Sequence, residues 1–144
     1  MLDKNLLYVL TILESIEKIF IYTEGFSDAE RFFFANDQIN FNATVNLLIA
    51  IGEDSKKLDS NVKDKYQTVN WKSILSLRNE LSHNYRGIDP DLIWDIVKNY
   101  LNDLKFVCIE IFKSLIKTTG TENKLDEILD PAFYAHIQYL KDSF

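Results

Sequence analysis

The feature that most constrains the fold is the spacing of apolar residues along two long runs. From Asn5 to about Thr23, apolar side chains recur every three or four residues, while charged ones such as Glu14 occupy the opposite face. A second run, from Leu92 to about Lys117, has the same spacing and contains neither glycine nor proline. Apolar residues at this period lie on one face of an α-helix, so each run predicts one long amphipathic helix.

Turn-forming residues are scarce, which extends the prediction to the whole chain. Only four glycines and two prolines occur in 144 residues. Both prolines follow an aspartate that can cap a helix, at Asp89 and at Asp130, where a last helix is expected. The sequence therefore predicts an all-α protein, an antiparallel bundle of four to five helices with short accessory helices. One core and a single domain over residues 1–144 are expected, with 121–144 as a C-terminal helical extension.

Capping residues predict helix starts between the two long runs. Ser27 with Glu30 fits a capping box, which would open a short helix through the consecutive phenylalanines 32–34. Because three consecutive side chains cannot face one core, at least one is expected to meet another element or another chain. Asp37 is expected to cap the next long helix, and Asn70 the one after it.

Composition excludes several functional classes. The net charge of -6 has the wrong sign for a protein that holds nucleic acid along a broad basic face, so any contact with RNA has to be local. The single cysteine, Cys108, lies among apolar residues and is expected to be buried in the core. No segment reaches the roughly 18 apolar residues of a membrane helix, and no signal peptide pattern is present. We expect a soluble, cytoplasmic protein without membrane association.

An arginine occupies a core position in the stretch between residues 71 and 87. At helical spacing this stretch has one apolar stripe, made by Trp71, Ile74, Leu75, Leu81 and Tyr85. Arg78 lies in the middle of the stripe. Because arginine is rarely buried without a partner, this position requires an explanation. In the preceding helix, Gly52 is a candidate for a close contact between helices.

Arg78, His83 and Tyr85 form the pattern R-x4-H-x-Y. On a helix, residues seven apart differ in direction by about 20° and residues five apart by about 140°. Arg78 and Tyr85 therefore share a stripe, whereas Arg78 and His83 do not. The arginine and histidine can converge in two ways: the helix end near Gly87 distorts and turns His83 inward, or a second copy of the chain completes the site.

An arginine and a histidine without a carboxylate cluster suit the cleavage of RNA. Histidine, with an ordinary pKa of about 6.5, can move a proton to or from the 2′-hydroxyl or the leaving oxygen, and a guanidinium can stabilise the charged transition state. Neither a metal nor another cofactor is required. The nucleophile would be the 2′-hydroxyl of the substrate, so DNA would not be cut and the product would be a 2′,3′-cyclic phosphate.

Simpler interpretations of the same residues remain open. A histidine at a helix end can be a favourable polar residue, and a tyrosine on an apolar stripe can be a core residue with its hydroxyl at the rim. The other histidine, His136, is expected to be a surface or structural residue. Asp89 and Asp91 are accounted for by helix capping, and no histidine or cysteine accompanies them, so no metal site is predicted.

The sequence RNELSHNY, preceded by NWKSIL and followed by RGIDPDLIWDIV, resembles the HepT family of the HEPN superfamily of ribonucleases. Proteins of that family carry R-x4-H-x-Y at the end of one bundle helix. Their next helix opens after an aspartate and carries a tryptophan, which match Asp89 and Trp94. The resemblance covers residues 51–104, and residues 122–144 have no counterpart in it.

The resemblance implies a toxin that acts as an endoribonuclease, with a homodimer in which two arginine and histidine pairs face one cleft. It also implies a partner, a nucleotidyltransferase antitoxin of the MNT family. Arg78 and His83 would be the catalytic pair, Asn79 would orient them, and Tyr85 would receive AMP groups from the antitoxin. A second hypothesis is a non-catalytic helical module that binds a nucleotidyltransferase partner or a nucleotide.

Overall fold

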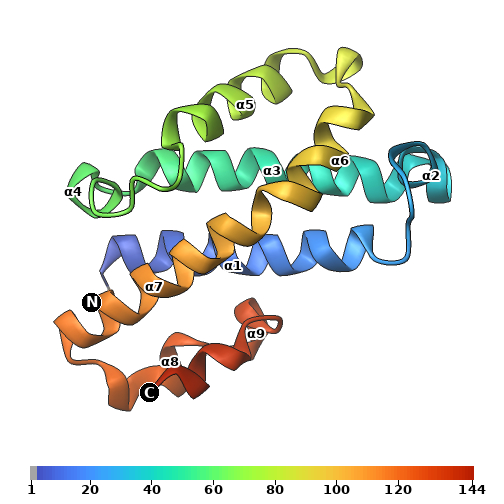
Figure 1. Ribbon diagram of the computed structural model, residues 1–144. Helices are drawn as coiled ribbons and strands as arrows, with labels where there is room; N and C mark the ends of the chain where they lie inside the picture. Colours follow the sequence, from blue (N-terminus) through green and yellow to red (C-terminus); the bar gives the residue numbers. More distant parts are fainter. Residues whose placement is uncertain (1–2) are drawn as a thin grey trace.

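Long α-helices make up the body of the protein in the computed structural model, which describes residues 3–144 apart from the side chain of Tyr85 (Figure 1). The long helices are α1 (Lys4–Thr23), α3 (Ile39–Lys57), α5 (Trp71–His83), α6 (Pro90–Asn99) and α7 (Leu101–Thr119). The short ones are α2 (Ala29–Phe34), α4 (Ser60–Lys63), α8 (Leu125–Ile128) and α9 (Pro131–Tyr134), with the 3₁₀ helices η1 (Ala35–Gln38), η2 (Tyr85–Gly87), η3 (Glu122–Lys124) and η4 (Gln138–Ser143). Every element within residues 3–144 is helical, which confirms the prediction of an all-α bundle.

The helices pack around a core centred on α1. Figure 1 shows α1 and α3 running antiparallel at the centre, with α5 on the outer side of α3 and the C-terminal segment on the far side of α1. α7 crosses α1 obliquely and packs against it. The largest fully buried side chains include Leu13, Ile16, Phe32, Leu81, Ile93, Ile111 and Phe112. The bundle therefore has one continuous apolar core, and α5 lies at its edge.

The run from Leu92 to Lys117 forms two helices, not the single long helix predicted. α6 and α7 meet at Tyr100, whose backbone leaves the helical conformation with φ -120° and ψ -30°. Neither glycine nor proline causes this break. The two helices pack on different partners: α6 on α2, where the rings of Trp94 and Phe32 lie 5.6 Å apart, and α7 on α1. The change of direction comes from tertiary packing, which the apolar period does not report.

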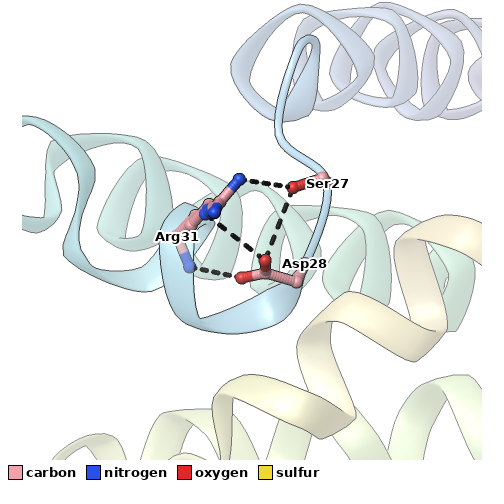
Figure 2. Close-up of polar contacts among 3 residues, drawn as sticks. All are labelled: Ser27, Asp28 and Arg31. Carbon is pink, nitrogen blue, oxygen red and sulfur yellow. Dashed lines mark hydrogen bonds and ion pairs between the residues drawn. The ribbon is translucent and has the colours of Figure 1, made fainter.

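The short helix α2 is capped one residue later than predicted. Figure 2 shows that Asp28, not Ser27, is the cap: its Oδ1 accepts a hydrogen bond from the backbone N–H of Arg31 at 2.8 Å. Ser27 Oγ instead lies 3.4 Å from the Asp28 carboxylate and accepts a hydrogen bond from Arg31 Nη1 at 3.2 Å. The capping box predicted for Ser27 and Glu30 was therefore wrong. The carboxylate of Asp28 is a stronger acceptor than the hydroxyl of Ser27, and it takes the capping position.

Asp37 does not cap α3, contrary to the prediction. Asn36, Asp37 and Gln38 all have positive φ, at 53°, 56° and 66°, and α3 begins directly after them without a side-chain cap. Non-glycine residues in this region cost about 1–2 kcal/mol each, so the turn needs support. A hydrogen bond from Asn36 Nδ2 to Asn40 Oδ1, at 2.8 Å, provides part of it.

The three consecutive phenylalanines of α2 do not share one environment. Phe32 is fully buried, Phe33 is half-buried, and Phe34 is 63% exposed. This confirms that one core cannot take all three side chains.

The C-terminal segment is not the single last helix predicted. It contains the one-turn helices α8 and α9 and ends in η4, although Asp130 caps α9 as predicted. The segment is attached to α1 through Glu14, which is 5% exposed. The Glu14 carboxylate accepts the backbone N–H of His136 at 2.8 Å and lies 2.5 Å from its Nδ1. His136 thus has a structural role, as expected, whereas the prediction that Glu14 lies on a polar face was wrong.

Two sequence expectations concern burial and hydropathy. Cys108 is fully buried in α7, which confirms its assignment to the core, and burial raises the pKa of its thiol to about 12. Between residues 3 and 144, every helix is too short or too polar to cross a membrane.

Candidate functional site

The candidate site lies on α5, at the edge of the bundle. Asn70 caps this helix as predicted, with its Oδ1 accepting the backbone N–H of Ser73 at 3.0 Å. α5 packs mainly on α3, and Leu81 is its only fully buried side chain among the described residues. The other described members of the apolar stripe, Trp71, Ile74 and Leu75, are half-buried, whereas Leu81 is buried. The stripe therefore faces α3 as its spacing indicated, and polar residues of α5 such as Lys72 and Glu80 are exposed.

α3 and α5 come close together at Gly52. A Cβ atom added to Gly52 would lie 2.7 Å from Cγ of Arg78 and closer still to its Cβ. No side chain can occupy that space, so the glycine allows the two helices to approach each other at this level. The close helix contact predicted for Gly52 is confirmed, and its partner is the arginine of the motif.

The guanidinium of Arg78 has partners on both helices. Its Nη2 forms an ion pair with the carboxylate of Glu53 on α3, and its Nη1 donates a hydrogen bond to Asn79 Oδ1 at 2.8 Å. Its Nε is buried and has no hydrogen-bond partner among the side chains that the structure describes. The Arg78 side chain is 25% exposed and that of Glu53 36%. The arginine is thus held in place while part of its guanidinium still reaches solvent.

His83 lies elsewhere on the same helix. It is the last residue of α5, and it is exposed. The helix stays regular up to this residue, and the N–H of Asn84 still bonds to the Glu80 carbonyl at 2.9 Å. Within the described part of the chain, no hydrogen bond or ion pair joins His83 to Arg78. The structure therefore does not turn His83 inward, the first of the two ways in which the pair could converge.

Tyr85 opens η2, directly after the end of α5. The modification predicted for its side chain lies outside the described residues. Beyond η2, Asp89 caps α6, accepting the backbone N–H of Asp91 at 2.9 Å, as predicted. In residues 3–144, no group of three His, Cys, Asp or Glu side chains is arranged to hold a metal ion.

Two cavities lie away from the motif. The larger, of about 730 Å³, is lined by residues of α1, α6, α7 and the C-terminal segment, among them Lys105 and Tyr139. The smaller, of about 390 Å³, lies between α4 and the start of α5 and is lined by Lys63 and Trp71 among others. Neither of these two cavities is lined by Arg78 or His83.

Sequence reasoning missed Glu53. The unusual core position of Arg78 indicated that it required a partner, but nothing in the sequence distinguished this glutamate from its neighbour Asp54. The side of α3 on which Gly52 lies, relative to the apolar face of the helix, could have narrowed the choice between Glu53 and Asp54. The actual pairing depends on how α3 and α5 cross.

The fold and the motif together define a helical-bundle protein of the HEPN ribonuclease class. The family model described as Ribonuclease HepT-like matches residues 12–111. The chain belongs to the HepT-like ribonuclease family, and the match ends before the C-terminal segment that had no counterpart in the resemblance.

The names of similar proteins agree with this assignment. The chain is similar to “Putative RNase MJ0127” of Methanocaldococcus jannaschii, with 36% identity over 109 residues, or 75% of this chain and 87% of that protein. “Putative RNase MJ1380” of the same organism is 34% identical over 98 residues, covering 68% of this chain and 87% of that protein. “Probable ribonuclease HepT” of Thermococcus cleftensis is 30% identical over 98 residues, covering 68% and 86%. No solved structure matches the chain.

Proposed function

We propose that this protein is a metal-independent endoribonuclease that acts as a homodimer. Arg78 and His83 are the catalytic pair, and Asn79 supports the arginine. The observation that carries the proposal is the combination of an arginine anchored on α3 and an exposed histidine five residues later, at the regular end of the same helix. Because these side chains diverge within one chain, the second copy of the chain supplies the missing partner.

In the proposed reaction, the substrate's 2′-hydroxyl attacks the adjacent phosphorus atom. His83 moves the proton, either from the 2′-hydroxyl or to the departing 5′-oxygen, and the Arg78 guanidinium stabilises the negative charge of the transition state. The bond between phosphorus and the 5′-oxygen breaks. The products are a 2′,3′-cyclic phosphate and a 5′-hydroxyl end, with no water consumed in this step.

Cleavage of RNA in EDTA tests this proposal. The purified wild-type protein should leave cyclic-phosphate ends, and a substrate with a 2′-deoxy nucleotide at the cleaved position should remain intact. Arg78→Ala and His83→Ala should fold and lose cleavage, whereas Lys117→Ala, which removes an exposed charge at the end of α7, should cleave normally. Full activity in either motif variant would refute the proposal.

Mixed dimers test the shared site. If each site takes Arg78 from one subunit and His83 from the other, a dimer of one Arg78→Ala chain and one His83→Ala chain contains one intact site. Random mixing of the two inactive proteins should then restore about a quarter of the wild-type rate, because half of the dimers are mixed and each has one of two sites. No recovery in mixtures shown to exchange subunits would contradict pairing across the interface.

The biological setting that we propose is a toxin and antitoxin pair. An MNT-type nucleotidyltransferase would transfer AMP from ATP to the Tyr85 hydroxyl, releasing pyrophosphate and adding negative charge beside the bound RNA. Coexpression with such an enzyme should give an AMP adduct at Tyr85 by mass spectrometry and should suppress cleavage. Tyr85→Phe should remain unmodified.

A non-catalytic role in assembly is the second candidate, and the acidic balance of the chain favours it. With a net charge of -6, the protein as a whole repels RNA. In this case the purified dimer would not cleave RNA, and Arg78→Ala would weaken capture of the nucleotidyltransferase partner. A cleavage assay and a binding assay on the same two variants separate the candidates.

A further inference from the structure

The seam between α3 and α5 holds an acidic group against the motif arginine. Glu53 follows Gly52 on α3, and the absence of a side chain at Gly52 brings the backbone of α3 close to Cβ and Cγ of Arg78. At this separation the Glu53 carboxylate reaches across the seam and pairs with Arg78 Nη2. The pair joins two different helices, so it fixes the guanidinium relative to the body of the bundle.

The hydrogen-bond donors of Arg78 are divided between the protein and solvent. A guanidinium has five N–H groups, in a planar fork. The Nε–H is buried, one Nη2–H faces Glu53, and one Nη1–H is donated to Asn79. These contacts leave two terminal N–H groups of the guanidinium, one on each Nη. Two parallel donors of this kind match two oxygens of a phosphate.

From this division of donors we infer that Glu53 is a positioning residue of the ribonuclease site, an inference that rests on the proposed function. Its carboxylate orients the Arg78 guanidinium so that the free edge of the fork faces the scissile phosphate. The negative charge of Glu53 also offsets part of the positive charge of Arg78. Before the reaction begins, the paired arginine therefore binds the RNA phosphate less tightly than an unpaired arginine would. Glu53 thus acts through Arg78 and does not itself touch the RNA.

Two substitutions at position 53 separate these effects. Glu53→Ala removes the acceptor and the charge, so kcat should fall by about tenfold or more as the guanidinium loses its orientation. Glu53→Gln keeps an acceptor oxygen for Arg78 Nη2 but removes the charge. Its kcat should stay within about threefold of wild type, while KM for RNA should fall because the arginine charge is no longer offset.

The matched control is Asp54→Asn, on the next residue of α3. Burial raises the pKa of Asp54, with Lys57 opposing this, and its side chain forms no ion pair with Arg78 in the described part of the chain. This variant also replaces a carboxylate by an amide, and it should leave both kcat and KM unchanged. A general effect of lost negative charge on RNA binding would lower KM in the control as well.

The measurements are steady-state RNA cleavage in EDTA and thermal unfolding of the same dimers. A purely structural ion pair would change the unfolding temperature of the position-53 variants but not the KM of Glu53→Gln. Wild-type kcat in Glu53→Ala together with an unchanged KM in Glu53→Gln would overturn the inference. If Glu53→Ala does not fold, KM of Glu53→Gln decides alone.

Failure of the inference and failure of the proposed function give different results. If wild type cleaves RNA and Arg78→Ala does not, the proposed function stands whatever happens at position 53. If Arg78→Ala cleaves as well as wild type, the proposed function fails first, and the inference about Glu53 fails with it.

Discussion

Gly52→Ala is the most direct test of how the candidate site is built. The added methyl group would lie 2.7 Å from Cγ of Arg78 and closer still to its Cβ. Cβ is bonded directly to the backbone, so a rotation of the arginine side chain cannot remove it from the contact. α3 and α5 therefore have to separate, and Arg78 moves away from Glu53 with them.

Two opposing terms set the change in the free energy of unfolding. Replacing glycine by alanine inside a helix stabilises it by about 1 kcal/mol through helix propensity. Forcing a methyl group into a packed contact costs about 1–3 kcal/mol, and the fixed position of the Arg78 Cβ favours the upper part of that range. The net loss expected is about 1–2 kcal/mol, which corresponds to a decrease in Tm of about 3–8 °C for a chain of this length.

Denaturant and thermal unfolding measure this change, with Asn46→Ala as the control. Asn46 is an exposed residue of the same helix, so its replacement gains helix propensity without entering the α5 contact. The control should be as stable as wild type or slightly more stable. An increase in Tm for Gly52→Ala equal to that of the control would refute the close packing of α3 on Arg78.

The same protein tests the link from packing to activity. A displacement of a catalytic group by about 1 Å can reduce the rate by about 100-fold. Gly52→Ala should therefore lose at least about tenfold in RNA cleavage at a temperature where it is fully folded, whereas Asn46→Ala should keep the wild-type rate.

Three further predictions concern the body of the bundle. Phe32→Ala should lower the free energy of unfolding by about 3–5 kcal/mol and Phe34→Ala by less than about 0.5 kcal/mol, because only the first side chain is buried; equal losses in denaturant titrations would contradict this. Glu14→Ala should cost about 1–3 kcal/mol and speed proteolysis of the C-terminal segment, since it removes both contacts to His136, while His136→Ala keeps the backbone hydrogen bond and should cost less. The pKa of Cys108 is raised by burial to about 12, so folding favours the neutral thiol: this contribution is complete below the ordinary thiol pKa of about 9 and is lost as the pH rises toward 12. A thiol reagent at pH 8 should then react only at the rate of unfolding, and faster modification of the folded protein would show that the thiol is accessible.

Local features of the sequence were enough to predict the class of fold. The apolar period of α1 and the caps at Asn70, Asp89 and Asp130 all depend on residues within a few positions of each other, and the structure confirms each of them. The failures at Ser27 and Asp37 were also local, where two neighbouring polar residues competed for one cap or where the backbone adopted a left-handed turn.

The motif itself was also visible in the sequence, including the divergence of Arg78 and His83 on one helix. The catalytic roles of these residues, of Asn79 and of Tyr85 remain predictions. What the sequence could not provide was the partner of the arginine, because Glu53 and Asp54 are equally plausible as a carboxylate along the chain. The crossing of α3 and α5 at Gly52 selects Glu53.

The sequence by itself determined that the chain forms amphipathic helices and carries an arginine where an apolar residue was expected, since both follow from the order of neighbouring residues. Only the tertiary structure decided that the helix run breaks at Tyr100, that Glu14 is buried beneath His136, 122 residues further along the chain, and that Arg78 pairs with α3. The physical reason is that these outcomes depend on which helix faces lie together in space. Many pairings of amphipathic helices satisfy the same apolar pattern, and packing of the whole core chooses among them.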